Sequence, residues 1–170
     1  MSDELLDIVN EKDEVIGQEY RSEVYRKKLN FRAIHAFLVN SKKEVWVPRR
    51  SPNKKLFPLC LDASVGGHVS AGESYLQAFE RELFEELNIV LSDVTYSFLE
   101  KVTPGTHKVA CFANVYVIYT DVTPNYNPAD FIEANWRNIS DIFKAIESGE
   151  KVKGDLPALI NVLNAQLQNM

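Results

Sequence analysis

Hydrophobic and polar positions follow two different periods along this 170-residue chain, and each period predicts a different kind of element. Short apolar runs rich in β-branched and aromatic residues, bounded by polar turns, are typical of strands. Windows in which apolar residues recur every three or four positions are typical of helices. Strands are predicted at 5–9, 15–18, 31–39, 45–47, 62–65, 94–102, 109–119 and 131–137, and helices at 22–29, 73–87, 140–147 and 155–168.

The order of these elements mixes strands and helices without strict alternation. It favours an α+β fold in which a mixed β-sheet lies between helices, an α/β/α sandwich, over a doubly wound parallel sheet. The first two strands predict an N-terminal hairpin over about residues 5–18. Pro48 is expected to end the pairing of the strand at 45–47, because proline has no N–H to donate. Neither a repeat nor a linker interrupts the pattern, so residues 1–170 are predicted to form one domain.

Composition and charge narrow the class of protein. Hydrophobic residues make up 45% and charged residues 25%, which is typical of a folded core. The net charge of −5 argues against a nucleic-acid polymer as partner, because such binding needs clustered positive charge. No apolar run reaches about 18 residues and no secretory signal is evident, so we expect a cytoplasmic protein without a membrane span. Cys60 and Cys111 lie in apolar stretches and are expected to be reduced core residues.

Three glutamates crowd one short stretch of the helix predicted at 73–87. Glu85 and Glu86 follow Glu82 by three and four positions, which places them about 5–6 Å from it on one helix surface. Like charges at this spacing destabilise a helix unless something compensates, and Mg²⁺ can do so because it takes hard oxygen ligands. Arg81 can pair with one glutamate and hold it in place. Taken alone, the segment is also typical of a solvated acidic helix face.

The residues upstream distinguish these alternatives. Gly66 and Gly67 permit close approach of the backbone to a ligand or a metal. The spacing from Gly67 onward resembles the Nudix box, G-x5-E-x7-R-E-U-x-E-E-x-G-U with U aliphatic, over residues 67–89. The matching residues are Gly67, Glu73, Arg81, Glu82, Leu83, Glu85, Glu86 and Ile89. Asn88 stands where the family has glycine, but asparagine tolerates the left-handed conformation and can end the helix in the same way.

The resemblance extends beyond the box. Arg49, Arg50, Lys55 and the segments 7–10 and 62–68 resemble the Nudix branch related to isopentenyl-diphosphate isomerases. This likeness implies the Nudix fold, a mixed β-sheet between helices. It also implies hydrolysis of a diphosphate linkage in a nucleoside diphosphate or one of its derivatives by a metal-activated water. The expected partner is therefore a small phosphorylated substrate, with a nucleotide favoured.

The resemblance assigns roles to individual residues. The expected ligands of Mg²⁺, for which Mn²⁺ could substitute, are the side chains of Glu82, Glu85 and Glu86 and the carbonyl of Gly66 or Gly67. Glu73 would brace the loop against the helix, and Arg81 would orient a glutamate. The candidates for the general base are Glu82 and Glu85 in the box, and Glu100, His107 and Glu133 outside it.

A basic loop after the strand at 45–47 is the predicted phosphate clamp. Arg49, Arg50 and Lys55 supply its charge, since a guanidinium fork suits a phosphate. A solvated basic loop without a ligand is the alternative. Four aromatic residues could stack on a base, although each is also typical of a core: Phe57, Tyr75, Phe112 and Tyr116.

Two other functions fit parts of the pattern. An isomerase of this branch would need a catalytic cysteine where this chain has Gly66 and a histidine metal ligand where Phe31 stands, and only His68 of that set is present. A non-catalytic nucleotide-binding module would usually lack box glutamates, and all of them are present here. Hydrolysis is therefore the favoured function. The sequence leaves the choice between a monomer and a homodimer open.

Overall fold

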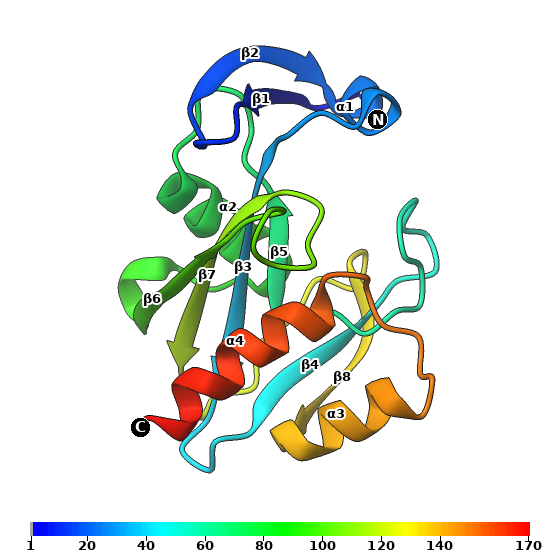
Figure 1. Cartoon of the computed structure of the whole chain (residues 1–170). Coiled ribbons are helices and arrows are strands. Elements are labelled where there is room, and N and C mark those ends of the chain that lie inside the picture. The colour runs from blue at the N-terminus through cyan, green and yellow to red at the C-terminus, as the bar shows by residue number, and fades with distance from the viewer. Residues whose placement is uncertain (1) are drawn as a thin grey trace.

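A mixed six-stranded β-sheet forms the centre of the computed structural model, which describes residues 2–170 (Figure 1). Five of its strands lie in the order β6-β7-β3-β4-β8, and β5 pairs with β3. β3 and β7 are parallel, whereas the other paired strands are antiparallel. The strands are β3 (Arg32–Val39), β4 (Val45–Arg50), β5 (Val65–His68), β6 (Thr95–Val102), β7 (Phe112–Tyr119) and β8 (Phe131–Arg137).

Helices cover both faces of this sheet. α2 (Tyr75–Leu87) packs on one face, and α3 (Ile139–Glu147) and α4 (Leu156–Gln168) pack on the other (Figure 1). A short 3₁₀ helix, η1 (Leu91–Asp93), follows α2. Successive residues of β3 point to opposite faces, so Ile34 joins the core beneath α2 and Phe37 joins the core beneath α4. The prediction of a mixed sheet between helices is confirmed.

An N-terminal hairpin lies outside the central sheet. β1 (Leu5–Val9) and β2 (Val15–Tyr20) pair antiparallel, with Leu5 opposite Tyr20, as the sequence predicts. α1 (Arg21–Lys27) follows β2 directly. The carbonyl of Leu5 accepts a hydrogen bond of 2.9 Å from the amide of Ala71. This bond fastens the hairpin to the loop that precedes α2.

β3 and β4 diverge, and a segment of chain fills the gap between them. Their register contains one pair, Val39 with Val45. Further along, the Ser64 hydroxyl donates to the carbonyl of Trp46 (2.6 Å) and accepts from the amide of Leu38 (2.9 Å). Ser64 thus bridges the two strands where they no longer pair directly. The next strand, β5, begins later than predicted and includes both glycines.

Pro48 does not end its strand, contrary to the prediction. β4 continues to Arg50 and pairs with β8, with Pro48 opposite Ala134. The carbonyl of Pro48 accepts a hydrogen bond of 3.1 Å from the amide of Asp62. Proline removes a donor and leaves its carbonyl intact, so the strand keeps neighbours on both sides at this position.

The structure also bears on the two cysteines and on the length of the helices. Cys60 and Cys111 are free and buried, as predicted. Every helix among residues 2–170 is too short or too polar to span a bilayer.

One buried carboxylate pins the turn of the hairpin to the main body of the protein. Asp13 has a left-handed backbone (φ 61°) and accepts hydrogen bonds from Arg32 Nε (2.7 Å) and the Tyr75 hydroxyl (2.8 Å). The ammonium of Lys101 also donates to this carboxylate. Burial acts to raise the pKa of Asp13, but hydrogen bonds from Lys101, Arg32 and Tyr75 outweigh it and hold that pKa below its usual range.

We predict that Asp13→Asn lowers the free energy of unfolding at pH 7 by about 1–2 kcal/mol, allowing for solvent screening. Asparagine keeps the left-handed turn, so the variant removes mainly the charge. Because the folded pKa is depressed, the contribution is complete above the unfolded pKa of about 3.9 and is lost as the pH falls through the folded pKa. Urea denaturation at pH 7 and pH 3 measures this, with exposed Asp93→Asn as the control. A difference that persists unchanged at pH 3 would contradict the ionic account.

Candidate active site

The two glycines of β5 leave room for other side chains. A Cβ atom at Gly67 would overlap the Cδ and Oε1 atoms of Glu82, so the Glu82 carboxyl occupies the space of the missing side chain. Gly66 lies opposite His35 in the β3–β5 register, and a Cβ atom there would come within 3.1 Å of His35 Nδ1. Gly67 is thus required by the close approach of Glu82, and Gly66 leaves room for His35; neither position has a positive φ.

Arg81 ties the loop before α2 to the helix itself. Its Nε and Nη2 atoms donate to the two carboxylate oxygens of Glu73 (2.8 and 3.0 Å), and Nη2 also donates to the carbonyl of His68 (3.0 Å). Glu73 accepts a further hydrogen bond from the amide of Ser70 (2.9 Å). Glu73 and Arg81 therefore have the contacts that bracing and orienting residues need.

The three box glutamates occupy different environments. Glu82 is bound by Arg81 Nη1 at 2.7 Å, and the same nitrogen lies 3.4 Å from Glu85 Oε2. Glu86 is buried, whereas the side chain of Glu85 is 56% exposed. The structure therefore brings Glu82 and Glu86 together in the interior and leaves Glu85 at the rim.

The carboxyls of Glu82 and Glu86 are largely buried, and little positive charge lies nearby to balance them. It raises the pKa of Glu82 to about 7, although the neighbouring charge of Arg81 acts in the opposite direction. Burial also raises the pKa of Glu86 well above its usual range, and the negative charges of Glu82, Asp62 and Asp130 add to that effect. A cation at this place would relieve an unfavourable concentration of negative charge.

The chemistry of this donor set fits Mg²⁺. Carboxylate oxygens and a backbone carbonyl are hard ligands of the kind that Mg²⁺ and Mn²⁺ take. Within residues 2–170, no three His, Cys, Asp or Glu side chains are grouped so that they could hold a metal ion as they stand. Arg81 Nη1 lies 2.7 Å from Glu82 and 3.4 Å from Glu85, so both carboxylates are engaged by this guanidinium.

Both arginines of the predicted phosphate clamp make contacts within the protein. Arg49 pairs with Glu133 (2.5 Å) and Glu150 (2.6 Å), so Glu133 is engaged away from the box. Arg50 pairs with Asp62 (2.8 Å) and donates to backbone carbonyls of the 51–60 loop. Lys55 is exposed on that loop. These contacts fasten the loop to the sheet and give both guanidinium groups a structural task.

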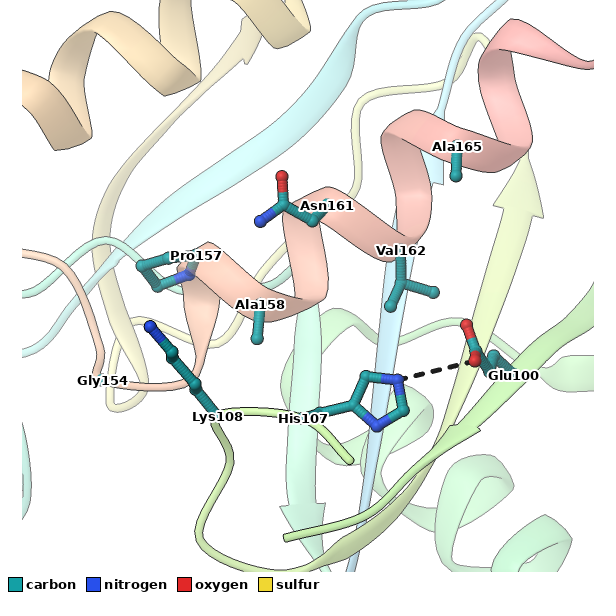
Figure 2. Close-up of a pocket in the computed structure, with 9 residues that line it drawn as sticks. All are labelled: Glu100, His107, Lys108, Gly154, Pro157, Ala158, Asn161, Val162 and Ala165. Carbon is teal, nitrogen blue, oxygen red and sulfur yellow. Dashed lines mark ion pairs between the residues drawn. The ribbon is translucent and has the colours of Figure 1, made fainter. Parts of the chain in front are cut away.

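Two other candidates for the general base lie in a groove beside α4. His107 Nε2 is 3.5 Å from Glu100 Oε1, and both side chains line a groove of about 660 Å³. Figure 2 shows Ala158 and Val162 of α4 opposite this pair. The groove lies on the α4 side of the sheet, whereas Glu82 and Glu86 belong to the helix on the other face. The structure does not place Glu100 or His107 with the box glutamates.

Three of the four aromatic candidates are engaged elsewhere. Tyr116 stacks on Phe79 with ring centroids 4.2 Å apart, and Phe112 is buried. Tyr75 donates its hydroxyl proton to Asp13. Phe57 is 45% exposed on the 51–60 loop. Of the four, Phe57 alone presents a largely open ring.

A cluster of charged side chains near Gly66 was missed by the sequence analysis. Asp155 Oδ2 lies 3.3 Å from His35 Nε2 and 3.7 Å from Lys153 Nζ. Lys153 Nζ is also 3.7 Å from Asp62 Oδ1. No sequence signal indicates this cluster, because its members are separated by up to 120 residues and follow no fixed spacing.

Asn88 ends α2 in the left-handed conformation, with φ 56° and ψ 32°. Its amide donates to the carbonyl of Phe84 (3.0 Å), and its side chain donates to the carbonyl of Asn125 (2.6 Å). The expectation that Asn88 can take the place of the family's glycine is confirmed. The helix end is intact despite the departure from the motif.

Comparison with known proteins agrees with this geometry. The model of the NUDIX domain family matches residues 29–157. The chain belongs to the Nudix family. An uncharacterized Nudix hydrolase of Nostoc sp. is 48% identical over 163 residues, which cover 95% of this chain and 96% of the relative. A crystal structure from Deinococcus radiodurans has a TM-score of 0.89 at 42% identity, covering 93% of this chain and 98% of that one.

A more distant likeness extends to the fold alone. The NUDIX domain of NrtR from Shewanella oneidensis has a TM-score of 0.61 at 17% identity, covering 86% of this chain and 98% of that one. The Nudix fold that the sequence predicts is therefore shared by close and distant members of the family.

We predict that Gly67→Ala lowers the free energy of unfolding by about 1–3 kcal/mol, because the new methyl group displaces the Glu82 carboxyl. Gly17→Ala is the matched control, since nothing lies within 4 Å of its Cβ position. We expect that control to stay within about 0.5 kcal/mol of the wild type. Urea denaturation measures both variants. Equal stability of the two would show that Glu82 does not need the space beside β5.

Proposed function

We propose that this Nudix protein is a Mg²⁺-dependent hydrolase of a diphosphate linkage in a nucleoside diphosphate or a nucleoside diphosphate derivative. The observation that carries the proposal is that Glu82, packed beside Gly67, and Glu86 are buried without enough positive charge to balance them. A binding site for a divalent cation would explain why this chain holds two carboxyls in so unfavourable a place. The metal would also attract the negative charge of a diphosphate.

Different residues of the site would have different roles in this reaction. Glu82 and Glu86 would hold the cation from the interior, with the carbonyl of Gly66 as a further ligand and Glu85 approaching from the rim. Bound Mg²⁺ supplies charge neutralisation for the diphosphate and lowers the pKa of water. The proton of the attacking water would pass to a carboxylate oxygen of Glu82 or Glu85. Arg81 and Glu73 would hold the helix and the loop in fixed relative positions during that transfer.

The structure offers little support for the isomerase alternative. Gly66 has no thiol to donate a proton, and a side chain at that position would press against His35 Nδ1. Both cysteines of the chain are buried outside β5. Simple nucleotide binding without catalysis is the remaining alternative, and a turnover assay separates it from hydrolysis.

The substrate panel follows from the proposed class. It comprises nucleoside di- and triphosphates, diphosphate sugars and dinucleotide polyphosphates. ADP-ribose belongs in it because the Shewanella oneidensis domain was solved in complex with that compound. At 17% identity this likeness concerns the fold alone. ADP-ribose is therefore a compound to be tested and is not assigned as the substrate.

We predict turnover of at least one panel compound that requires Mg²⁺ and is abolished by a chelator. Glu86→Gln should lower kcat by about a hundredfold or more, because it removes a charged ligand of the metal. Glu80→Gln is the matched control, since Glu80 is an exposed residue of the same helix. Product release is measured by phosphate detection and chromatography. No turnover of any compound, or equal turnover by wild type and Glu86→Gln, would refute the proposed function.

A further inference from the structure

Lys153 lies beside the segment that leads into β5. The amide of Leu61 donates to the carbonyl of Lys151, and the amide of Lys153 donates to the carbonyl of Leu61, each at 2.9 Å. Leu61 and Val152 form a parallel bridge. These bonds fix the backbone of 151–153 against the segment from which Asp62 projects. The position of Lys153 is therefore set by the same stretch of chain that delivers the two glycines.

The ammonium of Lys153 does not use its N–H donors for hydrogen bonds to the two neighbouring carboxylates. Its Nζ atom lies 3.7 Å from Asp62 Oδ1 and 3.7 Å from Asp155 Oδ2, and its side chain is 19% exposed. Both distances exceed the length of a hydrogen bond, so neither carboxylate accepts one from this ammonium. An ammonium has three donors, and leaving them unmade in a largely buried place is unfavourable. By contrast, Arg49 and Arg50 donate hydrogen bonds within the protein.

Two unpartnered polar atoms belong to Asp155, which faces this ammonium, and to His35, which contacts Asp155. His35 Nδ1 and Asp155 Oδ1 are buried and have no hydrogen-bond partner among residues 2–170. His35 contacts Asp155 through its other nitrogen and faces Gly66 across the β3–β5 pairing. A buried polar atom without a partner calls for an explanation such as an ordered water, and for Asp155 Oδ1 the partner must be a donor, which a phosphate oxygen is not. The unpartnered nitrogen of His35 thus lies beside Gly66 of β5.

The neighbourhood also connects Lys153 to the box. Asp62 pairs with Arg50 on one side and faces Lys153 on the other. Glu86 is among the negative charges that raise the pKa of Lys153, after Asp62 and Asp155. The contacts of Lys153 also lead to Gly66, because Asp155 lies 3.3 Å from His35 and a Cβ atom at Gly66 would come within 3.1 Å of His35 Nδ1. A phosphate bound at the box would lie within the field of this ammonium.

We propose that Lys153 Nζ binds a phosphate group of the substrate's diphosphate. The inference rests on the proposed function, because it names a residue of the same site. Asp62 and Asp155 keep the ammonium charged and in place without using its hydrogen bonds, and the phosphate oxygens accept them. Lys153 takes this role ahead of Arg49 and Arg50, whose guanidinium groups fasten the 51–60 loop. A purely structural ion pair with Asp62 and Asp155 is the competing account.

Binding of a diphosphate analogue tests the inference without relying on turnover. Methylenediphosphonate, which has a P–C–P bridge that cannot be hydrolysed, is titrated calorimetrically into the full chain with Mg²⁺ present. We expect Lys153→Gln to weaken binding about ten- to hundredfold, as for a lost charged hydrogen bond. Lys153→Arg should retain most of the affinity. Lys151→Gln, an exposed lysine two positions away, should bind as the wild type does.

Further variants and kinetics separate binding from folding. If Lys153→Gln does not fold, the double variant Lys153→Gln/Asp155→Asn removes the cation together with one of its acids, and the same loss of affinity is expected. With a substrate from the panel, Lys153→Gln should raise KM more than it lowers kcat. Wild-type affinity in a folded Lys153→Gln protein, or no binding of the analogue by the wild type, would overturn the inference. Loss of binding in a protein without turnover would support Lys153 while refuting hydrolysis.

Discussion

The packing of the Glu82 carboxyl against Gly67, with a second buried carboxyl on the same helix, is the constraint on which the rest of the site depends. Glu82 fills the space beside Gly67, and Glu86 is buried close to it. Such a pair is tolerated where neighbouring contacts hold it in position. Arg81 supplies those contacts, since it joins Glu82 to Glu73 and so connects helix, loop and strand. The spacing from Gly67 to Glu82 fits this arrangement, because Gly67 contacts Glu82 and Glu73 contacts Arg81.

A second consequence arises from the divergence of β3 and β4. Because the strands separate after one pair, polar groups enter the sheet between them, and Ser64 satisfies the backbone on both sides. Leading into β5, Asp62 lies 3.7 Å from Lys153, and His35 of β3 lies 3.3 Å from Asp155.

Local spacing allowed the sequence to predict the box helix, the hairpin and the role of Asn88 as a helix end. Each of these depends on residues a few positions apart, whose relative placement is set by helix or strand periodicity. Contacts between segments far apart in the sequence could not be predicted. Arg49 reaches Glu150 across 101 positions, which no pattern in a single sequence indicates. Pro48 was misjudged for a related reason, because the carbonyl that keeps it in the sheet bonds to a residue outside its strand.

The central claim is that Glu82 and Glu86 are held in the interior to bind a divalent cation. Calorimetric titration of Mg²⁺ in buffers of different ionisation enthalpy counts the protons released for each metal bound. Because burial raises the pKa of Glu82 to about 7 and raises the pKa of Glu86 well above its usual range, protons compete with the metal for these carboxyls. The account predicts proton release at pH 6–7 and an affinity for Mg²⁺ that rises with pH. Binding of Mg²⁺ without proton release and with an affinity independent of pH would contradict it.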